Sequence, residues 1–424
     1  MKINEILHYI EFNHVKFVRL AFCDIFGTLK NLSINAEDFI QALEQGINLD
    51  ASDVSGFMNF KKTDLLLFPD LETMSVLPWR STHEKVVRFF CDIKHLDKTP
   101  FEGDGRQFLR QAMEACEAYG YTPKIGIESE FYLFENDDRG KPTNISFDDA
   151  SYMDVTPLDG CENIRREICL ALEQMKVKTT MSYHEKGPGQ NVIIFEDDSA
   201  LKAADNMITF KNCVKSIALL NGLYASFLPR PLEDASGSGL RIKVTLSKND
   251  RNIFDDDYEV DIEEQRCFIA GVLNRVHEMS LILNPINNSY ERLGREKAPK
   301  YITWAKGNQS QLIRVDEKKD EYSYIMLRSA DASCNPYYAY ALLLYAGIEG
   351  MKNHEKLPED YSKIPIKQLP NDLKEAIESL KNSVFIKTVM NQKIIDKLCE
   401  VKLREVDEYN EKKRFENDPY FKLI

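Results

Sequence analysis

The sequence predicts an α+β fold in two domains of unequal size, and three observations lead to this interpretation. A chain of 424 residues is long enough for a large core and commonly divides into two domains. Segments in which apolar and polar residues alternate, the period of a β-strand, occur near residues 17–34 and 124–134. Segments with helical spacing recur along the rest of the chain, and we expect these helices to cover the sheets.

The first hundred residues read as a small domain that contains short strands and helices. Apolar spacing and turn residues give the order of the expected elements: a helix over 2–13, a strand over 17–24, a hairpin partner over 29–34, a helix over 36–45 and a strand over 86–93. Gly46 is a suitable end for the second helix, and the small and polar residues of 48–57 predict a loop. We place the domain boundary between about 95 and 106, which divides the chain into 1–100 and 101–424.

The second part of the chain is expected to be a curved, mostly antiparallel sheet with long helices outside it. Four segments carry helical periodicity and are predicted to form the outer layer: 161–175, 200–221, 259–280 and 335–353. Two further helices, over about 370–382 and 386–413, are expected to close the chain.

Composition excludes several classes of protein. Lys plus Arg number 55 and Asp plus Glu number 68, so the net charge of −13 argues against a nucleic-acid surface. The nine cysteines form no CxxC pair, which is typical of reduced thiols in a cytoplasmic protein. Because the N-terminus is polar and no run of 18 apolar residues occurs, we expect neither secretion nor a membrane span.

The stretch 124–134, KIGIESEFYLF, alternates apolar and acidic residues as a β-strand does. As a strand it places Glu128 and Glu130 on one face, about 7 Å apart. Two carboxylates at this distance repel each other unless a cation lies between them. Taken alone, the pattern favours the solvent-facing edge of an antiparallel sheet.

Several later motifs, in their order along the chain, resemble the signature of the glutamine synthetase family. They are YHEKGPGQN at 183–191, FLPRP at 227–231, GSGL at 237–240, NP at 284–285, NSYERL at 288–293, RSAD at 328–331 and NPY at 335–337. The resemblance extends from about Lys16 to the last helices, and the ordered set makes it specific. It identifies the chain as a divergent member of the class I, glutamate–ammonia ligase type.

The resemblance implies a β-grasp-like N-terminal domain, a glutamine-synthetase-type catalytic domain and a role in nitrogen metabolism. It also implies an oligomer of two stacked hexameric rings, a dodecamer, in which each site lies between neighbouring subunits. The family joins glutamate to ammonia through a γ-glutamyl phosphate, using ATP and two Mg²⁺ ions. Asp50 matches the aspartate that helps to deprotonate ammonium in the neighbouring subunit's site.

Three of the six positions that hold the two metal ions in the family are changed in this chain. For the ion near the amino acid, Glu130 and Glu185 are retained and Val192 replaces a glutamate. For the ion near the nucleotide, Glu128 is retained, Arg241 replaces a histidine and Met326 replaces a glutamate. A guanidinium cannot bind a metal, and a thioether is a poor ligand for magnesium.

Other positions of the family's site are partly changed and partly retained. Lys243 replaces a histidine that contacts ATP in the family, and Lys297 replaces the flap glutamate. Gln309 replaces an arginine that steadies the phosphoryl group, and Glu321 and Tyr324 replace basic residues near the nucleotide. The retained residues are Gly237, Arg292, Arg314 and Arg328 for the substrate, of which Arg292 and Arg328 are catalytic candidates, Thr245 near the nucleotide, and His184. Structural pairing with acidic neighbours is the alternative role for the arginines.

The substitutions lead to an electrostatic hypothesis and to three interpretations of function. We expect Arg241, Lys243 and Lys297 to form ion pairs with the glutamates that remain at the family's metal positions. The chain is then a glutamine synthetase-like pseudoenzyme, which acts as a binding, regulatory or structural oligomer. The alternatives are an active ATP-dependent carboxylate–amine ligase with a rearranged site, and a pocket that senses an amino acid or another carboxylate without a metal.

Overall fold

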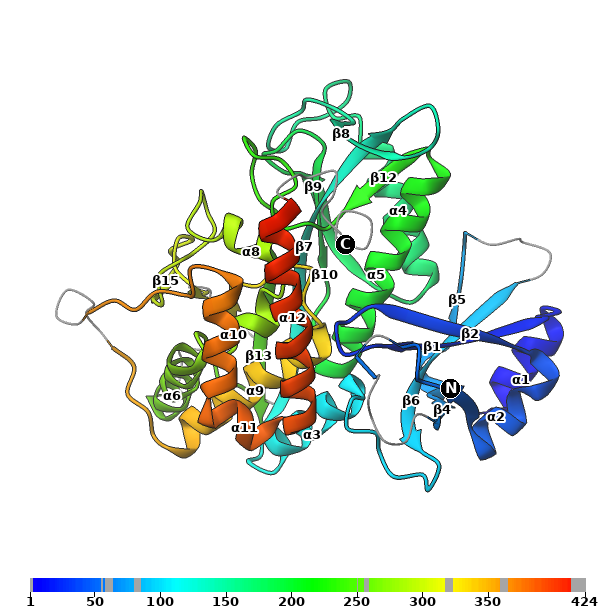
Figure 1. Ribbon diagram of the computed structural model, residues 1–424, viewed down its shortest axis with the longest axis horizontal. Coiled ribbons are helices and arrows are strands. Elements are labelled where there is room, and N and C mark those ends of the chain that lie inside the picture. Colours follow the sequence, from blue (N-terminus) through cyan, green and yellow to red (C-terminus); the bar gives the residue numbers. More distant parts are fainter. Residues whose placement is uncertain are drawn as a thin grey trace.

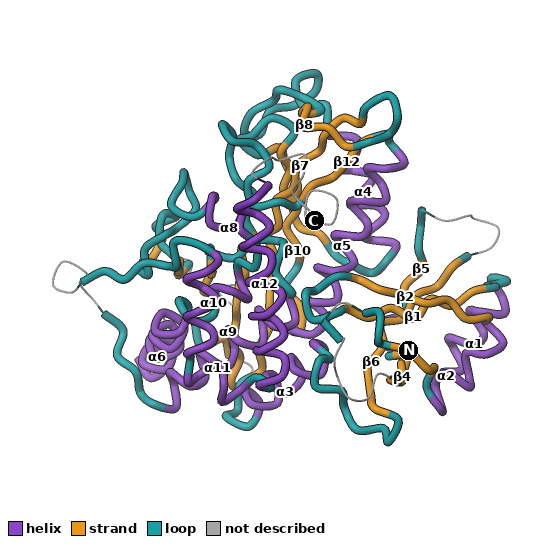
Figure 2. The backbone as a smooth tube through the Cα atoms, viewed as in Figure 1, coloured by secondary structure: helices purple, strands orange, loops and turns teal. Residues whose placement is uncertain are grey.

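The computed structural model describes residues 3–54, 56–57, 64–79, 85–249, 251–254, 259–316, 323–358 and 365–412. Two sheets organise these residues, a smaller one near the N-terminus and a larger one in the middle of the chain (Figure 1). Helices lie against both sheets, so the predicted α+β class is confirmed (Figure 2). Glu321 lies outside the described residues.

The smaller sheet has the strand order β2-β1-β6-β4-β3, with β5 paired to β6. Strands β1 and β6 are parallel, and the other pairs are antiparallel. Its elements are α1 (Ile3–Phe12), β1 (Phe17–Cys23), β2 (Leu29–Asn35), η1 (Ala36–Asp38), α2 (Phe39–Gln45), β3 (Ile47–Asp50), β4 (Asp64–Pro69), η2 (Leu71–Thr73), β5 (Ser75–Val76) and β6 (Val86–His95). The expected loop over 48–57 is partly wrong, because β3 pairs with β4 from Ile47 to Asp50.

The larger sheet is built around β7 (Thr122–Asn136) and has the strand order β15-β16-β17-β13-β7-β10-β9. Among the described strands of this sheet only β15 and β16 pair in parallel, so the expected antiparallel character is confirmed. The other strands are β8 (Pro142–Ser146), β9 (Thr179–His184), β10 (Gln190–Phe195), β11 (Asp198–Ser199), β12 (Leu223–Ser226), β13 (Leu240–Lys248), β14 (Arg251–Asn252), β15 (Trp304–Lys306), β16 (Ile313–Val315) and β17 (Ile325–Leu327).

The four predicted outer helices are present, but they do not form one layer on the sheet. Helices α4 (Glu162–Gln174) and α5 (Ala200–Leu220) pack on β9, β12 and β7. Helix α6 (Glu259–Arg275) packs chiefly on the apolar α9 (Pro336–Lys352), and α3 (Gly105–Glu117) packs on α9 as well. Close approach of α6 and α9 requires glycine, because a Cβ on Gly271 would lie 2.2 Å from the carbonyl oxygen of Ala346.

The closing helices differ in one respect from the prediction. Helix α10 (Leu373–Asn382) agrees, but the single helix expected over 386–413 is divided into α11 (Val384–Val389) and α12 (Gln392–Lys412). Met390 is extended, and the Asn391 side chain accepts the N–H of Lys393 at the start of α12. The remaining short helices are α7 (Ser280–Leu283) and α8 (Asn287–Arg292).

A buried arginine joins the two sheets. Arg106, on α3, donates to Asp92 Oδ1 and Asp70 Oδ2 at 2.8 Å each, and both carboxylates belong to the N-terminal part. The same guanidinium reaches Asp205 on α5 at 3.0 and 3.1 Å. Its side chain is 3% exposed, so these charges compensate one another away from water. This cluster fixes the small domain against the helices of the large one.

Replacing Arg106 with Met is expected to lower the free energy of unfolding by about 3–5 kcal/mol, because the buried Asp205 loses the cation with which it pairs. Arg110 contacts the same Asp70 and Asp92 but is 25% exposed, so Arg110→Met should cost less than about 1 kcal/mol. Urea unfolding of the two variants measures the difference. Equal, small losses would show that the cluster does not hold the domains together.

Candidate functional site

Strand pairing brings the candidate residues together from four neighbouring strands, β13, β7, β10 and β9. On β7, Glu128 and Glu130 face the same side because two residues make one period of a strand. Arg241 on β13 lies directly across from Glu128, and Val192 on β10 lies directly across from Glu130. Glu185 follows His184, the last residue of β9. The register alone therefore places one permanent cation beside the carboxylates.

Arg241 forms the ion pairs that the sequence analysis expected. Its Nη1 lies 3.0 Å from Glu128 Oε2 and its Nη2 lies 2.8 Å from Glu130 Oε1. The side chains are 18%, 11% and 9% exposed, respectively. Burial alone would lower the pKa of Arg241, but the carboxylates of Glu130 and Glu128 raise it above the ordinary value. The guanidinium is therefore a fixed positive charge between the two glutamates.

Glu185 is held less firmly than the other two glutamates. Its Oε1 lies 4.0 Å from Arg241 Nη2, beyond the distance of a hydrogen bond. Burial, followed by repulsion from Glu130, raises the pKa of Glu185 to about 7, although Arg241 and Lys297 oppose the shift. One guanidinium thus forms close ion pairs with two of the carboxylates and lies farther from the third.

The other two expected cations do not pair with the glutamates. Lys243 Nζ lies 5.1 Å from the ring centroid of Tyr324, and Lys297 Nζ lies 5.3 Å from that of Tyr152. No ion pair within 4.0 Å links either lysine to Glu128, Glu130 or Glu185 in the described part of the chain. The expectation is wrong in this respect: Lys243 lies two residues further along β13, opposite Gly126, beyond the reach of the carboxylates.

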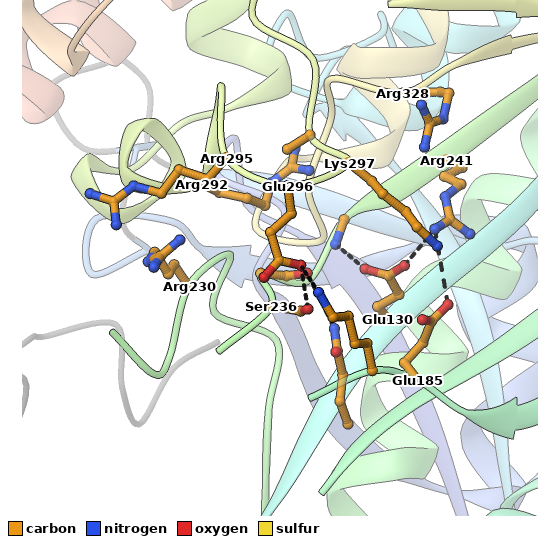
Figure 3. A pocket seen from close by; sticks show the side chains of 15 residues that line it. Glu130, Glu185, Arg230, Ser236, Arg241, Arg292, Arg295, Glu296, Lys297 and Arg328 are labelled. Atoms are coloured by element: carbon orange, nitrogen blue, oxygen red, sulfur yellow. Dashed lines mark hydrogen bonds and ion pairs between the residues drawn. The ribbon is translucent and has the colours of Figure 1, made fainter. Parts of the chain in front are cut away.

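A small cavity of about 60 Å³ opens beside Glu130 and Glu185, and most of its charged walls are basic. Figure 3 shows Arg241 and Lys297 close to the two glutamates, with Arg328 beside Arg241. The lining contains seven basic residues, Lys186, Arg230, Arg241, Arg292, Arg295, Lys297 and Arg328, and three acidic ones, Glu130, Glu185 and Glu296. The cavity thus has the charge of an anion site.

Two of the expected substrate arginines line this cavity and have different partners. Arg292 donates through Nη2 to the carbonyl oxygens of Ser329 and Ala330, at 2.5 and 2.9 Å. Arg328 has a buried Nη1 with no hydrogen-bond partner among the described residues, and burial and the nearby Arg241 lower its pKa to about 10. Gly237 also lies in the wall, where a Cβ would approach Arg292 Cγ to 2.6 Å.

The segment before Ala298 makes a contact that the sequence did not reveal. Ser236 Oγ donates to Glu296 Oε2 at 2.6 Å, and Lys186 Nζ lies 3.6 Å from the same oxygen (Figure 3). Glu296 has a left-handed φ of 50°. These contacts connect the loop that holds Glu296 to two other loops across the cavity.

The remaining candidate residues do not line the cavity. Asp50 is exposed at the end of β3, where its carboxylate accepts the N–H of Ser52 at 2.9 Å. Gln309 is exposed, and Arg314 on β16 lies 3.9 Å from Asp316. Three others lie on strands. Thr245 on β13 is opposite Lys124, and Met326 on β17 is opposite Lys243. Val192 on β10 is fully buried.

A second polar cluster behind the site was missed by the sequence analysis. Ligand atoms of Asp148, Asp159, Cys161 and His184 lie within 4.8 Å of one another, a spacing that could hold a metal ion. Each has internal partners, however: His184 Nε2 lies 2.9 Å from Asp148 Oδ1, and Arg165 pairs with Asp159. His184 Nδ1 also contacts the Glu185 carbonyl at 2.6 Å, so the cluster fixes the backbone next to Glu185.

The residues present do not fit two divalent ions at the glutamates. Mg²⁺ requires oxygen ligands in near-octahedral geometry, but Val192 and Met326 supply none. The guanidinium of Arg241 lies against both Glu128 and Glu130, and a divalent cation would have to displace it.

Comparisons with known proteins match nearly the whole chain. Residues 102–418 match the family model described as glutamine synthetase, catalytic domain, and residues 14–96 match glutamine synthetase, beta-Grasp domain. Glutamine synthetase of Clostridium saccharobutylicum is 38% identical, covering 96% of each chain, and that of Thermotoga maritima is 38% identical, covering 97% of each.

Solved structures agree with the fold. A glutamine synthetase structure from Plasmodium falciparum has a TM-score of 0.87 at 20% identity, covering 97% of both chains. A structure titled apo GmaS without ligand has a TM-score of 0.86 at 22% identity, covering 97% of this chain and 98% of that one. At these identities the likeness concerns the fold alone.

The pKa of Glu185 predicts the direction of a pH effect. Its ordinary value is 4.5, so between about pH 4.5 and 7 the folded protein holds a proton that the unfolded chain has lost. Stability should therefore fall as the pH rises through this window, by at most about 1.4 kcal/mol for each pH unit. Glu185→Gln resembles the protonated acid and should be more stable than the unmodified protein at pH 8.

Urea unfolding from pH 4.5 to 8 measures this difference, and subtracting the two profiles removes the contribution of other acids. Glu196→Gln is the control, because Glu196 is 53% exposed and pairs with the exposed Lys178. The control should have the same pH profile of stability as the unmodified protein. If Glu185→Gln has that profile too, the raised pKa of Glu185 is refuted.

Proposed function

This chain belongs to the glutamine synthetase family, and we propose that it has lost the family's ordinary Mg-ATP-dependent ligation of glutamate and ammonia. It keeps the fold of the family and acts as a binding, regulatory or structural protein. The observation that carries the proposal is the guanidinium of Arg241, which lies within 3.0 Å of both Glu128 and Glu130. A permanent cation there lies where a metal ion would bind and supplies positive charge without Lewis acidity.

The energetics favour the ion pair over a metal. Arg241 could leave the glutamates only by exposing its charge or by burying it elsewhere, and a buried charge without a partner costs several kcal/mol. Lys243 adds a further positive charge on the same face of β13, two residues from Arg241. These side chains would repel an incoming divalent ion, so magnesium affinity should be low.

What the cavity can still do is bind an anion. Arg292 and Arg328 lie in its wall, and Arg328 has a guanidinium nitrogen with no partner among the described residues. A planar guanidinium suits a carboxylate, to which it can donate two parallel hydrogen bonds. A small amino acid or another carboxylate is therefore the ligand class that we propose, bound without a metal.

We further propose that the protein is a homo-oligomer of the family's type, two stacked hexameric rings, in the cytoplasm. Asp50 supports assembly, because it is exposed at the end of β3 and does not line the cavity of its own chain. A neighbouring subunit would bring such a residue to a cavity. The described part of the chain contains no helix that is long and apolar enough to cross a membrane, and all nine cysteines are free thiols.

An active carboxylate–amine ligase with a rearranged site is the second candidate. It is favoured by the retention of three clustered carboxylates, Glu128, Glu130 and Glu185, which could share a single ion if Arg241 moved. ATP hydrolysis that depends on one member of a panel of amino acids and amines would support this candidate. No ATP hydrolysis with any member of the panel would support loss of the ligase reaction.

Calorimetric titration with Mg²⁺ tests the proposal. The unmodified protein should show no site of micromolar affinity, and γ-glutamyl hydroxamate should not form at the roughly 1 per second or more that enzymes normally reach. Arg241→His removes the permanent charge and supplies an imidazole, so this variant should bind Mg²⁺ more tightly than the unmodified protein.

Arg230→His is the matched control, because Arg230 lines the same cavity and donates to the carbonyl of Glu233 instead of a glutamate carboxylate. This variant should bind Mg²⁺ no better than the unmodified protein. Two micromolar magnesium sites in the unmodified protein, with turnover, would overturn the proposal.

A further inference from the structure

The polar cluster behind the site, formed by Asp148, Asp159, Cys161 and His184, offers the donor set of a zinc site. One thiol sulfur, one imidazole nitrogen and two carboxylate oxygens lie within 4.8 Å of one another. Zinc binds thiolate, imidazole and carboxylate ligands, whereas magnesium takes oxygen ligands. We call these four residues the thiol cluster. Its ligand chemistry differs from that of the glutamates around Arg241.

Two separate parts of the chain bring these side chains together. Asp148, Asp159 and Cys161 lie between β8 and α4, and Cys161 directly precedes the first residue of α4. His184 is the last residue of β9. An ion held by all four side chains would therefore cross-link this loop to the large sheet, next to the backbone of Glu185.

The imidazole of His184 is oriented as a metal ligand. Its Nδ1 lies 2.6 Å from the carbonyl oxygen of Glu185, which can only accept, so Nδ1 carries a hydrogen. Its Nε2 faces Asp148 Oδ1 at 2.9 Å. Two atoms with lone pairs approach this closely only when a proton or a metal ion lies between them. Zinc-binding histidines have the same arrangement, in which the other ring nitrogen donates to a carbonyl or carboxylate group.

Neighbouring groups outside the thiol cluster hold both of its carboxylates in place. The two oxygens of Asp148 accept the backbone N–H groups of Gly189 and Gly160, at 2.8 and 3.0 Å. Arg165 donates to Asp159 through both of its terminal nitrogens. A carboxylate has about four lone-pair sites, so both carboxylates keep capacity for a metal ion. Outer contacts of this kind orient the ligands of metal sites.

Permanent cations do not balance the buried charge of the thiol cluster. The side chains of Asp148 and Asp159 are 6% and 1% exposed. Among the residues that the structure describes, Arg165 is the only arginine or lysine within 4.0 Å of either carboxylate. A second positive charge is therefore required at Asp148, because a buried carboxylate without a partner is strongly destabilising.

We propose that the thiol cluster binds one Zn²⁺ ion, through Cys161 Sγ, His184 Nε2 and one oxygen each of Asp148 and Asp159. Tetrahedral zinc holds its ligand atoms roughly 3.3–3.7 Å apart, so side-chain shifts of less than about 1 Å would complete the site. The ion displaces the thiol proton and the proton between His184 and Asp148, and both protons are released to solvent. Because two positive charges replace two others, the total buried charge does not change.

Zinc at this place has a structural role, separate from the function proposed for the cavity beside Glu130. None of the four ligands lines that cavity. The ion would fix the loop before α4 and, through the ring of His184, the carbonyl group of Glu185. The two proposals are therefore independent, and the failure of one leaves the other intact.

Elemental analysis of the full-length protein tests the proposal. The protein is purified without a metal-affinity column, and one portion is unfolded and refolded with excess Zn²⁺, because the ligands are buried in the folded chain. After dialysis the refolded protein should retain about one zinc ion per chain. Cys161→Ala should retain less than about a fifth of that amount, because it lacks the thiolate ligand.

Cys213→Ala is the matched control, because Cys213 is as fully buried as Cys161 and lies outside the thiol cluster. Its Sγ lies 3.9 Å from the carbonyl oxygen of Ile168. Both variants lose a buried thiol, so both lose similar packing. Only Cys161→Ala should lose zinc.

X-ray absorption at the zinc edge identifies the ligands in the unmodified protein, so it remains decisive if Cys161→Ala does not fold. The spectrum should show one sulfur neighbour at about 2.3 Å and about three nitrogen or oxygen neighbours at about 2.0–2.2 Å. Zinc bound at the glutamates would instead have oxygen neighbours at the shorter distance.

Thermal unfolding with and without EDTA measures what the ion contributes to stability. EDTA should lower the unfolding temperature of the zinc-loaded unmodified protein and of Cys213→Ala, because an ion that binds only the folded chain stabilises it. The unfolding temperature of Cys161→Ala should not respond.

The proposal fails on any of three results. The first is less than about a fifth of a zinc ion per chain after refolding with excess Zn²⁺. The second is a zinc content that Cys161→Ala leaves unchanged, which would place the ion elsewhere. The third is an absorption spectrum without a sulfur neighbour.

Discussion

The ion pairs of Arg241 with Glu128 and Glu130 are the interaction on which the site depends. Alternation along β7 puts both carboxylates on one face, and Glu185 adds a third from the end of β9. Such a group requires a positive charge close by, from metal ions or from a side chain. The cross-strand register of β13 supplies the side chain directly opposite Glu128. The protein therefore has its positive charge built into the sheet, where a metal-dependent enzyme would take it from solution.

Buried basic groups in this protein differ in how far their charge is compensated. Arg106 has carboxylates from β6, α5 and the segment before η2, and Arg241 has two glutamates of one strand. Lys211 donates instead to a carbonyl oxygen, in a cavity where basic residues outnumber acidic ones. The first two arrangements are closed and serve structure.

The sequence could predict the parts of the fold and site that depend on local pattern. Alternation placed Glu128 and Glu130 together, and the charge change at Arg241 predicted its ion pairs. It could not place Lys243 and Lys297, because their distance from the glutamates depends on strand register and on the loop before Ala298. Contacts between distant segments, such as Glu296 with Ser236 or Asp148 with His184, have no periodic signal. The strand at Ile47–Asp50 was missed because it has only four residues and runs directly into small and polar residues, which are typical of a loop.

A crystal soaked with Mn²⁺ and a non-hydrolysable ATP analogue tests the central claim most directly, because manganese scatters anomalously and occupies magnesium sites. Our account predicts no anomalous peak among Glu128, Glu130 and Glu185, and density for the guanidinium of Arg241 between the first two. An anomalous peak at that position, with Arg241 turned away and nucleotide phosphates beside the ion, would contradict it.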